Sequence, residues 1–107
     1  MQLFLGVFLL FIASCEASAR DIPKIDIEAT CRLAPQSGSV SSSAYQSCVR
    51  DEAEARSQLE QQWRNFSPQH QTLCAQETEV GGSPSFVDVL TCLEMARDAA
   101  LSARQRR

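Results

Sequence analysis

The sequence has little histidine and none of the common catalytic or cofactor motifs. Its 107 residues include one histidine, one tryptophan and one tyrosine. No C-x-x-C pair, H-E-x-x-H motif, phosphate-binding loop or nucleophile elbow is present. A single histidine also leaves most zinc sites without a full set of ligands. We therefore predict that the protein is not an enzyme and that it has no cofactor and no metal site.

An excess of positive charge is also lacking. Ten Lys and Arg residues stand against thirteen Asp and Glu residues, which gives a net charge of -3. Nucleic-acid binding depends on cations that neutralise phosphates, so this balance excludes binding driven by bulk charge. We expect no nucleic-acid partner.

Isolated titratable residues do not form a predicted active site. His70 could act as a general base, but it follows Pro68 closely in an expected first helical turn and is better explained as a surface residue. Glu28, Glu77 and Glu94 are scattered along the chain, so their spacing indicates no pair of glycosidase carboxylates.

The amino-terminal segment predicts export. Residues 3–12 form an apolar run of ten residues, which is too short to span a bilayer as a mature helix. The small residues Ala17-Ser18-Ala19 follow it and match the A-x-A form that a signal peptidase accepts. We predict a signal peptide over 1–19, cleaved between Ala19 and Arg20, and a periplasmic or secreted mature protein.

A second interpretation of this segment stays open. Ile12-Ala13-Ser14-Cys15 resembles a bacterial lipoprotein box, in which the cysteine is lipidated and becomes the first residue. Cys15 would then anchor the protein to the envelope, and a membrane would be a partner only in this case. An uncleaved anchor is a third interpretation, for which the apolar run is short.

Four cysteines in the mature chain predict two disulfides. Removing 19 residues from 107 leaves 88, close to the lower limit for a self-sufficient hydrophobic core. Cys31, Cys48, Cys74 and Cys92 allow three connectivities. The point midway between Cys74 and Cys92 lies in a Gly-Gly-Ser-Pro turn, and the point midway between Cys31 and Cys48 lies in a serine-rich loop. A chain that reverses direction at these points brings the two cysteines of each pair opposite one another. We favour Cys31–Cys48 and Cys74–Cys92, each of which would contribute about 3 kcal/mol through loop closure.

The hydrophobic pattern of the mature chain predicts a small, all-α, disulfide-braced domain with about three helices. We expect an extended arm and a serine-rich loop over 20–43, although a short first turn of helix near Cys31 is an alternative. The helical domain over 44–107 should contain helices at 44–66, 69–79 and 85–102. Serines should cap them: Ser42 or Ser43 for the first, Ser67 before Pro68 for the second, and Ser83 before Pro84 for the third.

Within the first expected helix, charged and aromatic residues allow two interpretations each. Acid-before-base spacing pairs Glu52 with Arg56 and Glu60 with Arg64. The acidic cluster Asp51, Glu52 and Glu54 could bind a basic partner, but a solvated helix face explains it more simply. Trp63 and Phe66 could form a binding platform, but in a domain of this size they are better explained as core anchors.

The last expected helix carries an apolar stripe and a basic end. The stripe consists of Phe86, Val89, Leu93, Ala96 and Ala100. Arg104, Arg106 and Arg107 follow, where positive charge suits the helix dipole.

The stretch from Cys48 to Arg97 resembles the LprI-type lysozyme-inhibitor-like family of small exported bacterial proteins. The features that carry the resemblance are Cys48, Leu59, Trp63 with Phe66, Cys74 with Glu77, the Gly-Gly turn, and Cys92 followed by Arg97. The resemblance implies a helical exported domain that inhibits lysozyme by direct binding. The chain also resembles a group of small exported bacterial proteins that share segments such as residues 81–99.

Together these features favour a non-enzymatic module that binds a protein or cell-wall component of the envelope. Asp51, Glu54 and Glu60 are the candidate partner-binding residues, because an acidic face suits a basic lysozyme. The alternative is an envelope-associated structural or stress lipoprotein without a discrete ligand site.

The intact mass of the exported protein tests the predicted processing. We expect a soluble species that begins at Arg20 and takes an alkylating label at four cysteines only after reduction. A membrane-bound species that begins at Cys15 and carries acyl mass would instead establish lipidation. Labelling of the mature cysteines before reduction would contradict the two disulfides.

Overall fold

The computed structural model of the protein describes residues 21–33 and 42–107. The predicted signal peptide (1–19), its cleavage site before Arg20, and Cys15 lie outside these residues. The serine-rich stretch 34–41 lies outside them as well.

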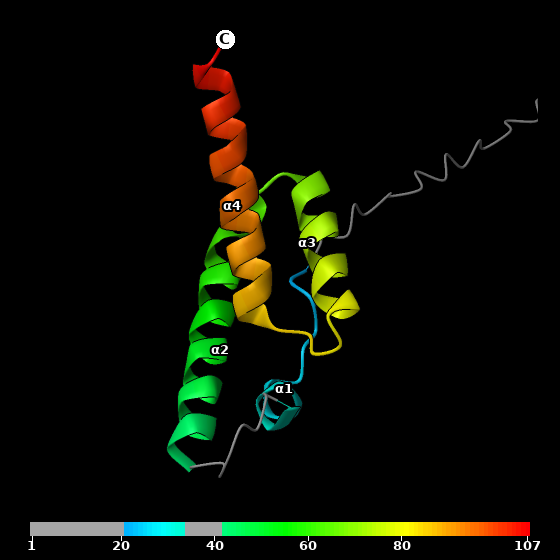
Figure 1. The fold of residues 1–107 in the computed structure, drawn as a ribbon, viewed down its shortest axis with the longest axis vertical. Coiled ribbons are helices and arrows are strands. Elements are labelled where there is room, and N and C mark those ends of the chain that lie inside the picture. Colours follow the sequence, from blue (N-terminus) through cyan, green and yellow to red (C-terminus); the bar gives the residue numbers. More distant parts are fainter. Residues whose placement is uncertain (1–20, 34–41) are drawn as a thin grey trace, which may run out of the picture.

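The described part of the chain is helical, which confirms the predicted fold class. Figure 1 shows α4 lying against both α2 and α3, with α1 beside the first half of α2. None of the described helices is long and apolar enough to cross a membrane. The elements are α1 (Ile27–Leu33), α2 (Ser42–Gln62), a short 3-10 helix η1 (Trp63–Asn65), α3 (Pro68–Val80) and α4 (Phe86–Gln105).

The hydrophobic core lies where α2, α3 and α4 meet. Leu59, Val89 and Leu93 are fully buried, and Trp63 and Phe66 are buried beside them, as expected for core anchors. Isoleucines from the segment that precedes α1 also pack against this core. The complete buried cluster is Ala55, Leu59, Trp63, Phe66, Cys74, Phe86, Val89, Leu90 and Leu93.

Two disulfides connect the α-helices, and their cysteine pairings are the ones that the sequence spacing favoured. Cys31–Cys48 joins α1 to α2, and Cys74–Cys92 joins α3 to α4. The two Cα atoms lie 5.6 Å apart in each pair, in the usual range for a disulfide. Each of the α-helices α1 to α4 is therefore covalently attached to another α-helix.

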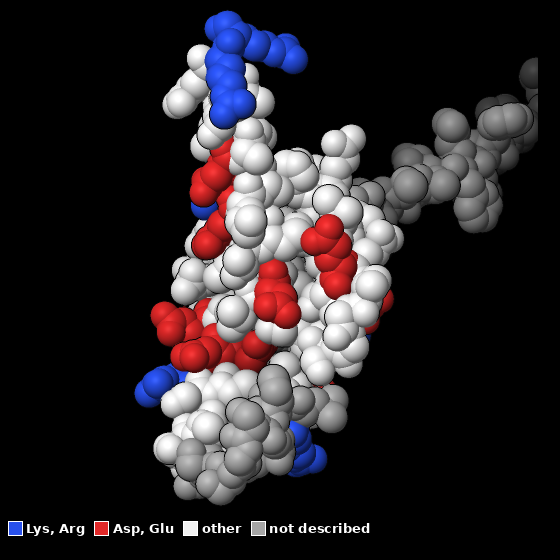
Figure 2. Space-filling view, viewed as in Figure 1, with Lys and Arg blue, Asp and Glu red and all other residues white. Residues whose placement is uncertain are grey.

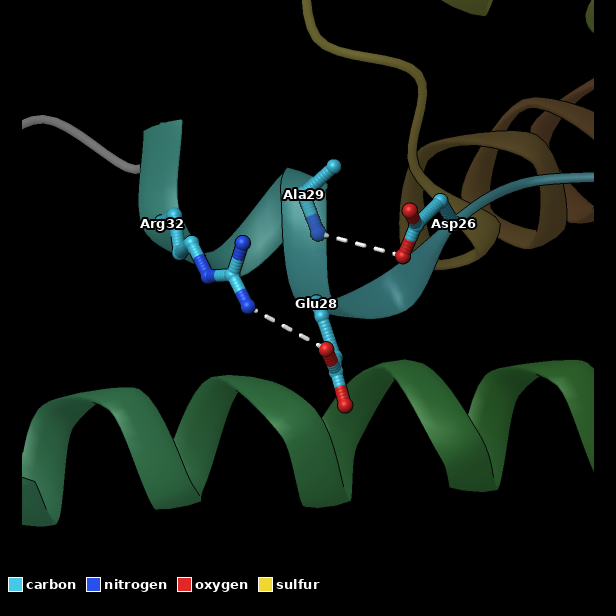
Figure 3. Close-up of polar contacts among 4 residues, drawn as sticks. All are labelled: Asp26, Glu28, Ala29 and Arg32. Atoms are coloured by element: carbon cyan, nitrogen blue, oxygen red, sulfur yellow. Dashed lines mark hydrogen bonds and ion pairs between the residues drawn. The ribbon is translucent and has the colours of Figure 1, made fainter.

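Residues 21–33 combine the two alternatives that the sequence left open, an extended arm and a short helix near Cys31. Residues 21–26 have no regular structure, whereas Ile27–Leu33 is a helix. Asp26 begins that helix, because its Oδ1 accepts a hydrogen bond of 3.2 Å from the Ala29 amide (Figure 3). Figure 3 also shows the ion pair between Arg32 and Glu28 on the side of α1 that faces α2.

The serine caps are confirmed at one helix and corrected at another. Ser67 Oγ accepts a hydrogen bond from the His70 amide at 3.2 Å, with Pro68 as the first residue of α3. Helix α2 begins at Ser42, next to the residues that the structure does not describe, so the cap at Ser42 or Ser43 stays a prediction. Helix α4 is capped by Ser85 rather than Ser83, because Ser85 Oγ accepts from the Asp88 amide.

The apolar stripe of α4 is buried only along the first half of the helix. Phe86, Val89 and Leu93 are buried, but Ala96 is half-buried and Ala100 is exposed. Figure 1 gives the reason: the last turns of α4 extend beyond the ends of α2 and α3. The stripe therefore contributes to the core mainly through its first three positions.

Glu52 corrects the interpretation of the acidic cluster as a solvated face. Its side chain is buried, and its carboxylate lies at the N-terminus of α4. One carboxylate oxygen accepts a hydrogen bond from Ser85 Oγ, and the other accepts from the Phe86 amide at 2.7 Å. The carboxylate thus satisfies an amide that the helix itself leaves unpaired and also complements the positive end of the helix dipole.

Side chains of α1 and α3 also form hydrogen bonds with the residues at which α4 begins. The Ser85 amide donates a hydrogen bond of 2.8 Å to Thr78 Oγ1 of α3. Thr30 Oγ1 of α1 donates one of 2.6 Å to the Pro84 carbonyl oxygen. Side chains from α1, α2 and α3 therefore all hold the segment at which α4 begins.

The ion pairs predicted along α2, Glu52 with Arg56 and Glu60 with Arg64, are wrong because Glu52 is buried at the start of α4. Because Glu52 points inward, Arg56 pairs instead with Glu60, with Nε and Oε1 3.1 Å apart. Glu60 is therefore engaged with Arg56 rather than with Arg64.

Replacing Glu52 by glutamine should destabilise the domain, because the side chain keeps its shape but loses its charge and one acceptor. We expect Glu52→Gln to lower the free energy of unfolding by about 1.5–3 kcal/mol, the usual contribution of a hydrogen bond to a charged group. Urea unfolding followed by the fluorescence of Trp63 measures the change. Glu54→Gln is the matched control, because Glu54 is exposed on the same helix and should change stability by less than about 0.5 kcal/mol. Equal unfolding midpoints for the two variants would contradict the assigned role.

Candidate functional site

The three acidic residues proposed to bind a partner do not share one face of α2. At 3.6 residues per turn, Glu60 lies about half a turn around the helix from Asp51. Asp51 and Glu54 are exposed on one side. Glu60 lies on the other side, where it lines a hollow beside residues 21–26. The structure therefore separates Glu60 from the other two candidates.

The carboxylates of Asp51 and Glu54 are weakly engaged. Asp51 Oδ1 lies 4.0 Å from Nε of its neighbour Arg50, and both side chains are mostly exposed. Such exposed pairs contribute little to stability, because solvent screens them. Glu54 has no ion pair within the described chain. Both charges are therefore available to a partner.

Acidic side chains gather where α4 begins beside α2 (Figure 2). The exposed acidic residues of these two stretches are Asp51 and Glu54 on α2 and Asp88 in the first turn of α4. We call these three residues the acidic patch. The buried Glu52 and its bonds to α4 fix the two helices relative to one another beneath it.

Basic side chains gather at the opposite end of α4. Figure 2 shows them at the tip of the helix, which extends past its neighbours. Arg104 lies in the last turn, and Arg106 and Arg107 follow it; all three are exposed. Arg97, earlier in α4, is placed differently, because its Cζ lies 5.1 Å from the centre of the Phe66 ring and packs over it as a cation–π contact.

A groove between α2 and α3 is a concave feature of the described chain. Residues 21–26, which we call the arm, run along this groove and leave a hollow on each side. The first hollow measures about 790 Å³ and is bounded by α2 and η1, and the second measures about 500 Å³ and is bounded by α3. Both hollows are lined by Trp63 and by the arm residues Asp21, Pro23, Lys24 and Ile25.

Trp63 is buried in the floor of this groove with one polar atom unsatisfied. The residue is only 7% exposed, and its Nε1 has no hydrogen-bond partner. Its backbone carbonyl is satisfied, because the side-chain amide of Gln71 donates to it and, at 3.2 Å, to the carbonyl of Phe66. The backbone around Trp63 is therefore fixed, whereas its indole N–H is left without an acceptor.

We call the groove formed by α2, η1 and α3 around Trp63 the Trp63 groove. Its rim carries charges of both signs. Arg56, Glu60 and Arg64 stand on the α2 side, and Glu79 stands on the α3 side.

The remaining chemistry-bearing residues have structural positions. His70 is half-buried in the first turn of α3, where its amide donates to Ser67 Oγ. Glu77 Oε2 lies 3.3 Å from Cys92 Sγ, beside the second disulfide. The described residues contain no group of three or more His, Cys, Asp or Glu side chains arranged to hold a metal ion.

Three buried polar residues that build this region were not predicted from the sequence: Glu52, Gln71 and Thr78. A signal for them was present in the spacing. Glu52 lies at helical intervals from Ala55, Leu59 and Trp63, on the face that the apolar pattern assigns to the core. A polar residue at such a position predicts a buried partner.

Comparisons of the chain with family models, with curated proteins and with solved structures find no match.

Proposed function

We propose that the protein is a non-enzymatic, protein-binding module of an oxidising compartment outside the cytoplasm. The observation that carries this proposal is the acidic patch, a set of exposed carboxylates on two helices whose relative position is fixed. Asp51 and Glu54 contribute from α2, and Asp88 contributes from α4. Such a surface suits a partner with clustered lysine or arginine residues.

The two disulfides support both parts of the proposal. Disulfides persist in oxidising compartments and are rare in the cytosol, which agrees with the predicted signal peptide. They also hold the helices in place before binding, so that little conformational entropy is lost when a partner docks. A small rigid domain of this kind can bind through a surface of modest size.

Lysozyme is the first partner to test, because it is strongly basic and because the chain resembles lysozyme-inhibitor-like proteins. In this proposal Asp51 and Glu54 contact lysozyme. Glu60 does not belong to this surface, since it pairs with Arg56 on the other side of α2. The inhibitor would act by covering the enzyme, without chemistry of its own.

The test uses the oxidised mature chain, residues 20–107, and measures lysozyme binding by calorimetry at low and at physiological salt. We expect the double variant Asp51→Asn/Glu54→Gln to weaken binding about 3- to 10-fold, since each exposed charge contributes up to about 1 kcal/mol. The loss should shrink as salt increases, because salt screens exposed charges. Glu77→Gln/Asp98→Asn is the matched control with the same change in net charge, and it should bind like the parent protein.

Three results would count against this proposal. No binding to lysozyme at low salt would exclude the lysozyme-inhibitor-like form. Equal loss in both double variants would show that net charge, rather than the acidic patch, drives association. Absence of any stoichiometric partner in a pull-down from an envelope extract would favour the envelope protein without a discrete ligand site.

A further inference from the structure

The end of α4 carries a compact cluster of cations. Arg104 lies in the last turn of the helix, and its carbonyl oxygen accepts a hydrogen bond of 3.4 Å from the Arg107 amide, so the chain keeps turning past the helix end. Arg104, Arg106 and Arg107 are all exposed, and none of them forms an ion pair within the described residues. We call these three residues the arginine tip.

The helix dipole accounts for only part of this cluster. Positive charge is favourable in the last turn of a helix, and Arg104 already supplies it there. Arg106 and Arg107 add like charges beside it, and like charges held close together repel one another. An anion from outside the chain would relieve this repulsion.

The charge at this end of the molecule is of one sign. Residues 99–107 include the three arginines and no Asp or Glu, and Figure 2 shows no acidic side chain among them. The acidic patch lies at the other end of α4, because Asp88 precedes Arg104 by 16 residues, or about 24 Å along the helix axis. An anionic surface would therefore attract the arginine tip and turn the acidic patch away from itself.

The shape of the arginine tip indicates a flat partner. The last turns of α4 extend beyond α2 and α3, so the tip is a convex projection (Figure 1). A convex projection reaches a flat, extended surface directly, whereas a folded protein would need a matching concave site. Leu101 lies about one turn before Arg104 and is 50% exposed. An exposed leucine beside cationic residues is typical of helices that bind the headgroup region of a bilayer.

We propose that the arginine tip docks the domain on an anionic lipid surface. The guanidinium groups bind lipid phosphates through paired, charge-assisted hydrogen bonds, and Leu101 enters the headgroup layer. The projecting turns of α4 then hold the rest of the domain away from the surface, with the acidic patch toward solution. This contact is peripheral and requires no lipid on Cys15, which the sequence-based expectation made the condition for a membrane partner.

This site goes beyond the proposed function and does not depend on it. The acidic patch takes a basic protein at one end of α4, whereas the arginine tip takes lipid at the other. Loss of lysozyme binding would leave the lipid proposal intact, and the reverse also holds.

Co-sedimentation with vesicles tests the proposal. The experiment uses the oxidised chain without residues 1–19, because the apolar run at 3–12 would bind lipid by itself, and the described core and both disulfides lie in the part that is kept. We expect binding to vesicles of phosphatidylglycerol and phosphatidylcholine in equal parts, and none to pure phosphatidylcholine. Binding should weaken from about 0.1 M to about 1 M salt, because the range of electrostatic attraction falls about threefold. Equal binding to both kinds of vesicle would overturn the proposal.

Substitution of the arginine tip locates the contact. Each basic residue near an anionic surface contributes a factor of about 5, so Arg104→Gln/Arg106→Gln/Arg107→Gln should weaken binding about 100-fold. Replacing the same three arginines by lysine keeps the charge and should change binding by less than about 5-fold.

A matched control makes the same change in net charge away from the arginine tip, at exposed positions on the arm, α1 and the first half of α2. It replaces Lys24, Arg32 and Arg50 by glutamine. This variant should bind vesicles like the parent protein. Equal losses in the two glutamine variants would show that net charge alone drives association, and they would overturn the proposal.

Leu101 distinguishes a lipid surface from other anions. Leu101→Ser should weaken vesicle binding about 3- to 5-fold, because the exposed half of the side chain no longer leaves water. Leu73→Ser is the matched control, since Leu73 is 49% exposed on α3, and it should have no effect. Soluble polyglutamate should bind at least 10-fold more weakly than vesicles of equal anionic charge. Equally tight binding of polyglutamate would assign the arginine tip to an acidic protein segment and overturn the lipid proposal.

Nuclear magnetic resonance with a nitroxide label on the lipid headgroup measures the orientation of the bound domain. We expect the label to broaden the amide signals of residues 101–107 and to leave those of Asp51 and Glu54 sharp. Uniform broadening, or broadening of Asp51 and Glu54 alone, would contradict docking through the arginine tip.

Discussion

The carboxylate of Glu52 accepts hydrogen bonds from Ser85 Oγ and the Phe86 amide, at the point where α4 begins. Helix α4 packs on both of the other long helices, so the position of its first turn sets the geometry of the whole domain. A buried carboxylate tolerates few alternatives, because removing its partners would leave a charge without compensation. This constraint gives the domain one arrangement of its helices, which apolar packing alone would specify less sharply.

Covalent and polar attachments connect the helices of the domain on each side. Cys31–Cys48 and Cys74–Cys92 connect α1 to α2 and α3 to α4, and the cap at Ser85 connects α2 to α4. Between α2 and α3, the side-chain amide of Gln71 donates to the carbonyls of Trp63 and Phe66, and the isoleucines of the arm pack beside this contact. Covalent and polar contacts therefore reinforce the packing of every long helix on its neighbours.

The sequence allows the helices and disulfides to be predicted, because both depend on local signals. Helical periodicity marks the three long helices, and the symmetry of cysteines about two turns marks the pairs. Residue spacing alone leaves the partner of an ambiguous side chain open. Arg56 has a glutamate four residues away on each side, and Glu52, which shares the face of the core residues, is the one that turns inward to cap α4. In the same way, serines flank Pro84 on both sides, and the bond between the Ser85 amide and Thr78 selects the second as the cap.

The candidate site was less predictable, because it depends on residues that only the fold brings together. Asp51, Glu54 and Glu60 form one acidic group in the sequence, yet α2 turns Glu60 toward the arm and leaves the other two beside α4. Trp63 has two roles at once: its ring anchors the core while its N–H remains unsatisfied. The core needs only the ring, which a phenylalanine would largely supply. The indole nitrogen is therefore the part of this residue that packing leaves unexplained.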